Sequence, residues 1–208
     1  YFYSILNIRY YLLSFYNLDE MKICVYCSSS SKIEKKYFDC TKELAKEFLK
    51  ENVEVVYGGG GGGLMGHLAD VIIDNGGKIT GISPKFMQDI EWTHKRLEKL
   101  ELVDTMHERK SKFLENIDAV IALPGGCGTL DELIEAITLK RLGLFLKPIV
   151  IINIQGFYNP LLQMLERCVD QNFMDKRHLK MWNVVDETNN IVDILSLIHI
   201  SEPTRPRS

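Results

Sequence analysis

The chain has 208 residues, of which 46% are hydrophobic and 25% are charged, and its formal net charge is −3. This length suits one well-cored α/β domain and is short for two. The small net charge and the lack of a long basic tract argue against a nucleic-acid-binding protein. Five cysteines, an odd number scattered through strand and helix patterns, indicate reduced thiols and a cytoplasmic protein.

The two ends of the chain differ from the part between them. Residues 1–20 hold seven of the twenty aromatic residues, and a clean strand pattern begins only at Met21. The leader is too short and polar to predict a membrane span, and it lacks a signal-peptide cleavage site. We interpret it as translated upstream sequence, or else as an organelle-directing or membrane-surface extension. The domain is expected to span residues 21–195, and residues 196–208, where the helical pattern breaks at Ser196, are interpreted as a non-native tail.

From Lys22 onward, short apolar runs alternate with stretches of helical periodicity. Strands are predicted at residues 22–27, 53–57, 78–83, 100–104, 119–123, 149–154 and 182–185. Helices are predicted at residues 37–49, 64–74, 106–116, 130–142 and 160–171, and from Thr188 onward. This alternation predicts a single α/β domain with a doubly wound parallel sheet flanked by helices. Residues 84–99 lack a clear pattern and are expected to form a loop or a short helix near the surface.

Cysteines and serines in the first predicted strand and just after it could carry chemistry. Cys24 and Cys27 have C-x-x-C spacing, but they fall on a strand, where residues three apart point to opposite faces, so we expect both to pack in the core. The histidines show no ligand spacing with each other or with cysteine, and no metal is expected. Residues 28–31 are serines at the carboxyl end of the strand, where open α/β sheets bind ligands. They form either a simple turn or contacts to a ligand.

A glycine run follows the second predicted strand. Gly61, Gly63 and Gly66 match the G-x-G-x-x-G pattern of dinucleotide sites. The next strand does not end in the acidic residue that would hold an adenosine ribose, and the glycines do not follow the first strand. An NAD site is therefore disfavoured, and a loop that lets a nucleotide or ribose approach the backbone is preferred.

The predicted helix at residues 106–116 carries an unusual arginine. Thr105 and Glu108 have the spacing of a capping box, which gives Glu108 a structural role. Arg109 lies on the same helical stripe as Met106, Phe113 and Ile117, which should face inward. Either its stem covers the core while its head reaches water, or its guanidinium points at a phosphate in the site.

The stretch from Ala119 to Gly143 carries the clearest functional signal. An apolar strand ends at Pro124, glycines at positions 125, 126 and 128 supply a turn with few side chains, and a helix follows. Backbone N–H groups converge at such a helix N-terminus and can hold a phosphate. The sequence therefore predicts a phosphate cradle here.

Glu132 has two possible roles in this stretch. Thr129 and Glu132 have capping-box spacing, so Glu132 could simply cap the helix. Asp131 and Glu132 are also expected in the first helical turn, where the helix dipole favours an ionised carboxylate. A carboxylate there repels a bound phosphate unless a positive charge lies between them, and a developing oxocarbenium ion is such a charge. Both readings remain open at this point.

Together these motifs resemble one family. Residues 124–132 read PGGCGTLDE and are similar to the PGGxGTxxE signature of the LOG ("Lonely guy") phosphoribohydrolases, which have also been labelled lysine decarboxylases. The motifs YGGG at 57–60, GLMG at 63–66 and MHERK at 106–110 add to a similarity that runs from about Met21 to Glu187. The combination is specific, although no single motif is. No lysine sits in a recognisable Schiff-base setting, which disfavours decarboxylation.

The resemblance implies hydrolysis of the N-glycosidic bond of cytokinin riboside 5′-monophosphates, with AMP as a related substrate, by a Rossmann-like homodimer without a cofactor. It maps the family's catalytic pair onto Arg109 and Glu132. No nucleic acid or membrane partner is expected. The expected substrate-binding residues are Ser28, Ser29, Gly59, Gly60, Met106, Lys110, Pro124, Gly125, Gly126, Gly128 and Thr129.

Three residues depart from the family's usual ones. Ser28 replaces a glycine, Leu139 a tryptophan and Arg141 a glutamine. The last two are expected beside the dimer or base-binding surface, so the preferred base is left open. A rival hypothesis is a non-catalytic carrier of a phosphorylated cofactor, such as a molybdenum-cofactor carrier, which would share the glycine-rich cradle. The presence of both Arg109 and Glu132 favours the enzyme, because a carrier needs no such carboxylate.

Overall fold

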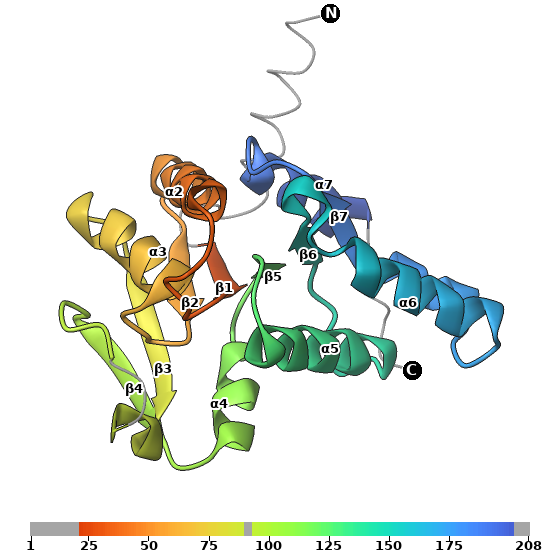
Figure 1. Ribbon diagram of the computed structural model, residues 1–208, viewed down its shortest axis with the longest axis horizontal. Helices are drawn as coiled ribbons and strands as arrows, with labels where there is room; N and C mark the ends of the chain where they lie inside the picture. Colours follow the sequence, from red (N-terminus) through yellow and green to blue (C-terminus); the bar gives the residue numbers. More distant parts are fainter. Residues whose placement is uncertain (1–20, 90–92, 202–208) are drawn as a thin grey trace, which may run out of the picture.

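The computed structural model of the protein describes residues 21–89 and 93–201. Seven strands, all paired in parallel, form one sheet in the order β4-β3-β2-β1-β5-β6-β7 (Figure 1). The strands are β1 (Lys22–Tyr26), β2 (Glu54–Tyr57), β3 (Ile79–Pro84), β4 (Lys99–Val103), β5 (Ala119–Ala122), β6 (Ile149–Ile152) and β7 (Asn183–Val185). The doubly wound parallel sheet predicted from the alternating pattern is confirmed.

The helices cover both faces of this sheet. They are α2 (Lys35–Lys50), α3 (Gly63–Asp74), α4 (Met106–Phe113), α5 (Cys127–Arg141), α6 (Asn159–Asp170) and α7 (Ile191–Ser201). Three short 3₁₀ turns are η2 (Lys85–Asp89), η3 (Ile154–Gly156) and η4 (Lys176–Lys180). All predicted strands and helices are present, with ends shifted by a few residues, and η2 lies in the segment expected to be a loop or short helix.

The end of α7 corrects one expected boundary. The helical pattern was expected to break at Ser196, yet α7 continues through this residue to Ser201. The Ser196 hydroxyl donates to the Val192 carbonyl one turn earlier, at 2.9 Å, so it stays within the helix without an unpaired polar group. The interpretations of residues 1–20 and of the last seven residues lie outside the described part of the chain.

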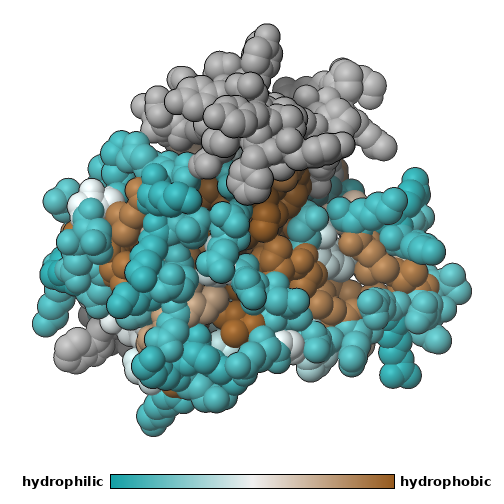
Figure 2. Space-filling model, turned by 90° about the horizontal axis from the view of Figure 1, so that it is seen from above, coloured by the Kyte–Doolittle hydropathy of each residue, from teal (hydrophilic) through white to brown (hydrophobic). Residues whose placement is uncertain are grey.

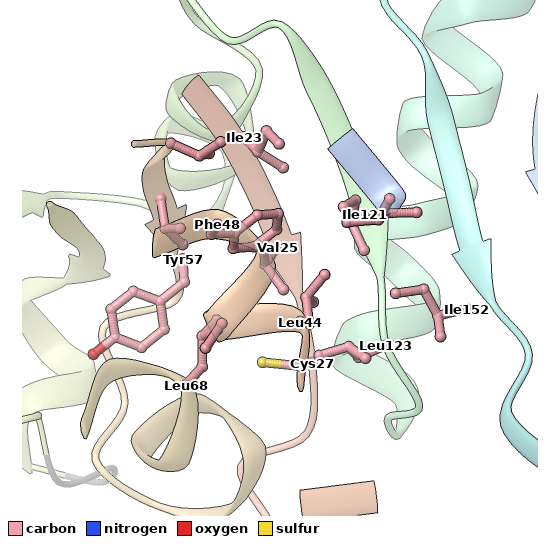
Figure 3. Packing of buried hydrophobic residues seen from close by; sticks show 14 of the residues in the cluster. Ile23, Val25, Cys27, Leu44, Phe48, Tyr57, Leu68, Ile121, Leu123 and Ile152 are labelled. Carbon is pink, nitrogen blue, oxygen red and sulfur yellow. The ribbon is translucent and has the colours of Figure 1, made fainter. Parts of the chain in front are cut away.

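The two central strands, β1 and β5, separate two hydrophobic cores. Ile23 and Val25 belong to the core that lies under α2, α3 and α7, and Figure 3 shows them beside Leu44, Phe48 and Leu68 of α2 and α3. Cys24 and Tyr26 belong to the core that lies under α4, α5 and α6. This alternation places Cys27 in the first core and Cys24 in the second, which confirms the prediction that both cysteines pack on opposite faces.

The topology also places a site at one edge of the sheet. The chain runs from β1 outward to β4 and then returns to add β5 on the other side of β1, so the strand order reverses between β1 and β5. In open α/β sheets, ligands bind beyond the carboxyl ends of the strands at such a switch point. The serines that follow β1 and the glycines that follow β5 both lie at this position.

Within the described residues, no helix is both long and apolar enough to cross a membrane.

Candidate functional site

Arg109 of α4 and Glu132 of α5 meet at the edge of the sheet. Arg109 Nη1 lies 3.4 Å from Glu132 Oε1, and the two side chains are only 7% and 10% exposed. The helices that carry them lie next to each other (Figure 1). Two residues that sequence reasoning linked only through the family resemblance thus form a buried ion pair.

The Arg109 guanidinium is held by main-chain groups as well. Its Nε donates to the Ile82 carbonyl at 3.1 Å, its Nη2 donates to the Gly58 carbonyl at 3.2 Å, and its Cζ lies 4.9 Å from the centre of the Phe113 ring. The alternative that Arg109 reaches water is wrong, because the whole residue is 6% exposed. The guanidinium carries more N–H groups than these contacts use, so it can also serve a ligand.

Gly58 is matched to this arginine. A side chain at position 58 would collide with Arg109 Nη2 and with the sulfur of Met65. The first glycine of the run therefore leaves room for the close approach of the guanidinium, independently of any nucleotide.

The capping box expected at Thr129 is absent from the structure. Helix α5 begins at Cys127, with Gly126 as its N-cap and no side-chain cap. Thr129 is already inside the helix and buried, and its side chain fills the space beside Gly125. Asp131 and Glu132 consequently lie in the second helical turn and not, as expected, in the first. Glu132 is thereby excluded as a cap, and its carboxylate faces Arg109 instead.

The other predicted capping box, at the start of α4, is confirmed. Thr105 is the N-cap, its Oγ1 accepts from the Glu108 N–H at 3.1 Å, and Glu108 Oε2 accepts from the Thr105 N–H at 3.3 Å. Glu108 Oε2 also accepts from the Asp104 N–H at 2.7 Å. These bonds fix the start of α4 and with it the direction in which Arg109 enters the site.

The turn before α5 is open where a phosphate would bind. Gly126, Cys127 and Gly128 are exposed, and a Cβ at either glycine would meet nothing within 4 Å. The first N–H groups of a helix have no partner within the helix, and here no side chain caps them. This geometry suits an anion. Pro124 is buried behind the turn.

The glycine-run helix, α3, has its N-terminus closed. The Gly63 N–H donates to Ser31 Oγ at 3.0 Å, and the N–H groups of Leu64 and Met65 donate to the Ser28 carbonyl at 2.9 and 3.2 Å. The loop that follows β1 thus occupies the place that a pyrophosphate takes in dinucleotide sites. This agrees with the earlier argument against NAD. Ser28 is half-buried and Ser29 is exposed.

Gly59 and Gly60, two expected substrate contacts, lie deeper than the cradle. Both are buried beneath the segment after η2: the His94 N–H donates to the Gly59 carbonyl at 2.9 Å, and Gly60 forms an isolated bridge with Thr93. Gly59 has φ of 76°, a conformation that favours glycine. Their role as substrate contacts stays a prediction.

Met106 and Lys110 flank Arg109 on α4. Met106 was expected to face inward with Arg109, and this is wrong: it is the first residue of α4, beyond the packed part of the helix, and is 36% exposed. Lys110 Nζ pairs with Asp131 at 3.2 Å and also with Glu135, so two carboxylates of α5 hold its charge. The hydrogen bond to Glu135, followed by that to Asp131, raises the pKa of Lys110. Its role as a substrate contact stays a prediction.

The charge of Glu132 extends into the core beneath it. Burial raises the pKa of Cys24 well above its usual value, and the negative charge of Glu132 adds to this effect. The pKa of Tyr26 is raised by burial and then by Cys24 and Glu132.

Among the described residues, no cluster of three His, Cys, Asp or Glu side chains could hold a metal ion.

Sequence reasoning missed Tyr158, which lies next to the turn before α5. Its hydroxyl donates to the Leu123 carbonyl at 2.7 Å, and the side chain is buried. The available signal was its position just beyond the predicted strand at 149–154, at the same edge of the sheet as the glycine turn.

Comparisons with known proteins show the family of the chain. Residues 65–195 match a family model described as "Possible lysine decarboxylase". Over 153 residues the chain is 41% identical to cytokinin riboside 5′-monophosphate phosphoribohydrolase LOG2 of Arabidopsis thaliana, which covers 74% of the chain and 72% of the relative. The Arabidopsis enzyme LOG1 is 39% identical over 160 residues, or 76% and 75% of the two chains. The chain belongs to the LOG family.

Solved structures show how widely the fold of this LOG-family chain is shared. The crystal structure of TM1055 superposes with a TM-score of 0.67 at 21% identity, covering 85% of the chain and 99% of TM1055. The molybdenum cofactor carrier protein of Chlamydomonas reinhardtii superposes with a TM-score of 0.65 at 14% identity, covering 88% and 99%. At these identities the likeness concerns the Rossmann-like fold alone.

Proposed function

We propose that this LOG-family chain hydrolyses the N-glycosidic bond of cytokinin riboside 5′-monophosphates, and of AMP, to the free base and ribose 5-phosphate. The observation that carries the proposal is the buried Arg109–Glu132 pair, one helical turn beyond the open N-terminus of α5. Its LOG relatives in Arabidopsis carry this activity in their names.

Each part of the site has a task in this reaction. The N–H groups of residues 125–129 bind the 5′-phosphate. As the bond between C1′ and the base nitrogen breaks, the ribose gains oxocarbenium character, which the Glu132 carboxylate stabilises. Glu132 orients a water that adds to C1′, and the proton that this water releases passes through solvent to the nitrogen of the leaving base, so the carboxylate is regenerated. Arg109 holds Glu132 in place, and contacts the ribose or phosphate with its remaining N–H groups.

The decarboxylase description of the family model has no counterpart in the site. A lysine that forms a Schiff base needs a lowered pKa, which burial or a neighbouring cation supplies. No lysine is buried in the described part of the chain, and the pKa of Lys110, the lysine nearest the ion pair in sequence, is raised.

The carrier hypothesis is supported only by a shared fold, and it gives no role to a buried carboxylate beside the cradle.

The proposal predicts that the 5′-phosphate is essential. Each charge-assisted hydrogen bond from the cradle contributes about 1.5–3 kcal/mol, so adenosine should have a kcat/KM at least about 100-fold below that of AMP. The measurement is release of free base from purified protein with AMP, isopentenyl-AMP and the matching nucleosides. Equal kcat/KM for adenosine and AMP would remove the α5 cradle from the mechanism. Tight nucleotide binding without any turnover would favour the carrier.

We also propose a cytoplasmic homodimer that needs no cofactor. Hydrophobic residues reach the surface of the face drawn in Figure 2. Around α5 and α6 the exposed apolar side chains include Ile134, Leu142, Leu144, Leu146 and Met164. An apolar surface of this kind supports self-association. All five cysteines lie in the described residues and none forms a disulfide there, in keeping with a reducing compartment. Sedimentation as a monomer would contradict the dimer.

A further inference from the structure

The turn between β6 and α6 folds one tyrosine back onto the central strands. Gln155 and Gly156 have φ of 50° and 74°, and this pair of left-handed residues reverses the chain. The buried Asn153 organises the turn: its Oδ1 accepts from the Tyr158 N–H at 2.7 Å, and its Nδ2 donates to Asn159 Oδ1 at 2.9 Å. The turn therefore fixes the backbone of Tyr158 independently of the contacts that its side chain makes.

The Tyr158 side chain then reaches the end of β5. Its hydroxyl donates to the Leu123 carbonyl at 2.7 Å, although the residues are 35 positions apart. Tyr158 is 1% exposed, and its ring meets Phe157 edge to face, with 5.0 Å between ring centres. Burial raises the pKa of Tyr158, so the hydroxyl keeps the proton that it donates.

The position of this bond matters because the cradle has few other restraints. Leu123 is the last residue before Pro124, and Gly126 and Gly128 have no side chains to hold the turn. Proline has a fixed φ and no N–H to donate. The orientation of the Leu123 carbonyl therefore determines the direction in which the chain enters the glycine turn. On the helix side, the Thr129 side chain packs against Gly125. On the strand side, the Leu123 N–H donates to the Tyr26 carbonyl at 2.9 Å, and Tyr158 is the side chain that holds the Leu123 carbonyl.

We propose that Tyr158 is a positioning residue of the phosphate cradle, which holds the Leu123 carbonyl so that the N–H groups of residues 125–129 converge on the 5′-phosphate. This inference rests on the proposed function, because it assumes that a phosphate binds there. Tyr158 acts on the cradle through the Leu123 main chain and does not itself contact the substrate.

Tyr57 provides a matched control. Like Tyr158 it is fully buried, and it is the last residue of β2, but its hydroxyl has no hydrogen-bond partner. Tyr57→Phe and Tyr158→Phe thus remove the same atom, and only the second breaks a bond. The experiment measures the inhibition constants of inorganic phosphate, ribose 5-phosphate and adenine against AMP hydrolysis by the full chain.

For Tyr158→Phe we expect the constants for phosphate and ribose 5-phosphate to rise about five- to tenfold, as loss of one buried hydrogen bond can produce. The constant for adenine should stay within about twofold, and Tyr57→Phe should change none of the three. A merely structural role for Tyr158 would lower Tm without separating phosphate from adenine. Unchanged phosphate inhibition, or a parallel rise for phosphate and adenine, would overturn the proposal.

A second variant covers the case in which Tyr158→Phe does not fold. Asn153→Ala removes the acceptor of the Tyr158 N–H and leaves the hydroxyl in the protein. It should weaken phosphate inhibition selectively in the same way, and an unselective or absent effect would count against the proposal. Failure of the wild-type protein to hydrolyse AMP would instead contradict the proposed function. In that case, phosphate binding by wild type and variants, measured by calorimetry, still tests Tyr158: equal affinity would overturn its role.

Discussion

Replacement of Glu132 by glutamine is expected to lower kcat by about two or more orders of magnitude, because the carboxylate stabilises positive charge that develops only in the transition state. Glutamine keeps the length of the side chain and can accept a hydrogen bond from Arg109. Since Glu132 does not cap α5, the change costs no helix cap. Nucleotide binding should be retained, or become tighter, because a negative charge near the phosphate is removed. Turnover of AMP and nucleotide affinity are the two measurements.

Glu135→Gln is the matched control for this experiment. Glu135 lies on the same helix and pairs with Lys110. Its neutralisation removes an equal charge from α5 without touching Arg109, so turnover should stay close to that of the wild type. Near-normal kcat in a well-folded Glu132→Gln protein, or an equal loss in Glu135→Gln, would contradict the proposed mechanism.

Replacement of Arg109 by alanine should cost both stability and activity. The change leaves the Ile82 and Gly58 carbonyls and the buried Glu132 carboxylate without the guanidinium. Removal of one partner from a buried ion pair typically costs about 3–5 kcal/mol. Nucleotide binding and turnover should fall together, unlike in Glu132→Gln. Urea unfolding gives the change in stability, and kcat and KM for AMP give the change in function.

Two further variants separate charge from geometry. Arg109→Lys keeps the charge but loses the planar fork that reaches two carbonyls and a carboxylate at once, so it should recover part of the stability and little activity. Arg96→Ala breaks a partly exposed pair with Asp70 and Asp74 on α3, and it should cost much less stability than Arg109→Ala, because solvent screens exposed ion pairs. An Arg109→Ala protein as stable as Arg96→Ala would show that the buried guanidinium does not hold the site together.

Local sequence patterns determined most of the architecture. Apolar runs and helical periodicity predicted every strand and helix of the described residues, because burial of one face imposes its period on the sequence. The inward stripe of Arg109, the capping box at Thr105 and the glycine turn after β5 were likewise readable. Each of these features depends on neighbours within a few residues along the chain.

Only the tertiary structure decided where α5 begins and what Arg109 binds. Glycines tolerate many backbone conformations, so the sequence of the turn did not show that the helix starts at Cys127. It therefore did not show that Glu132 has no capping role. The partners of Arg109 and Tyr158 are main-chain carbonyls of residues far away in sequence, Gly58, Ile82 and Leu123. A carbonyl is present at every position and gives no sequence signal. The fold alone selects which of them a buried donor meets.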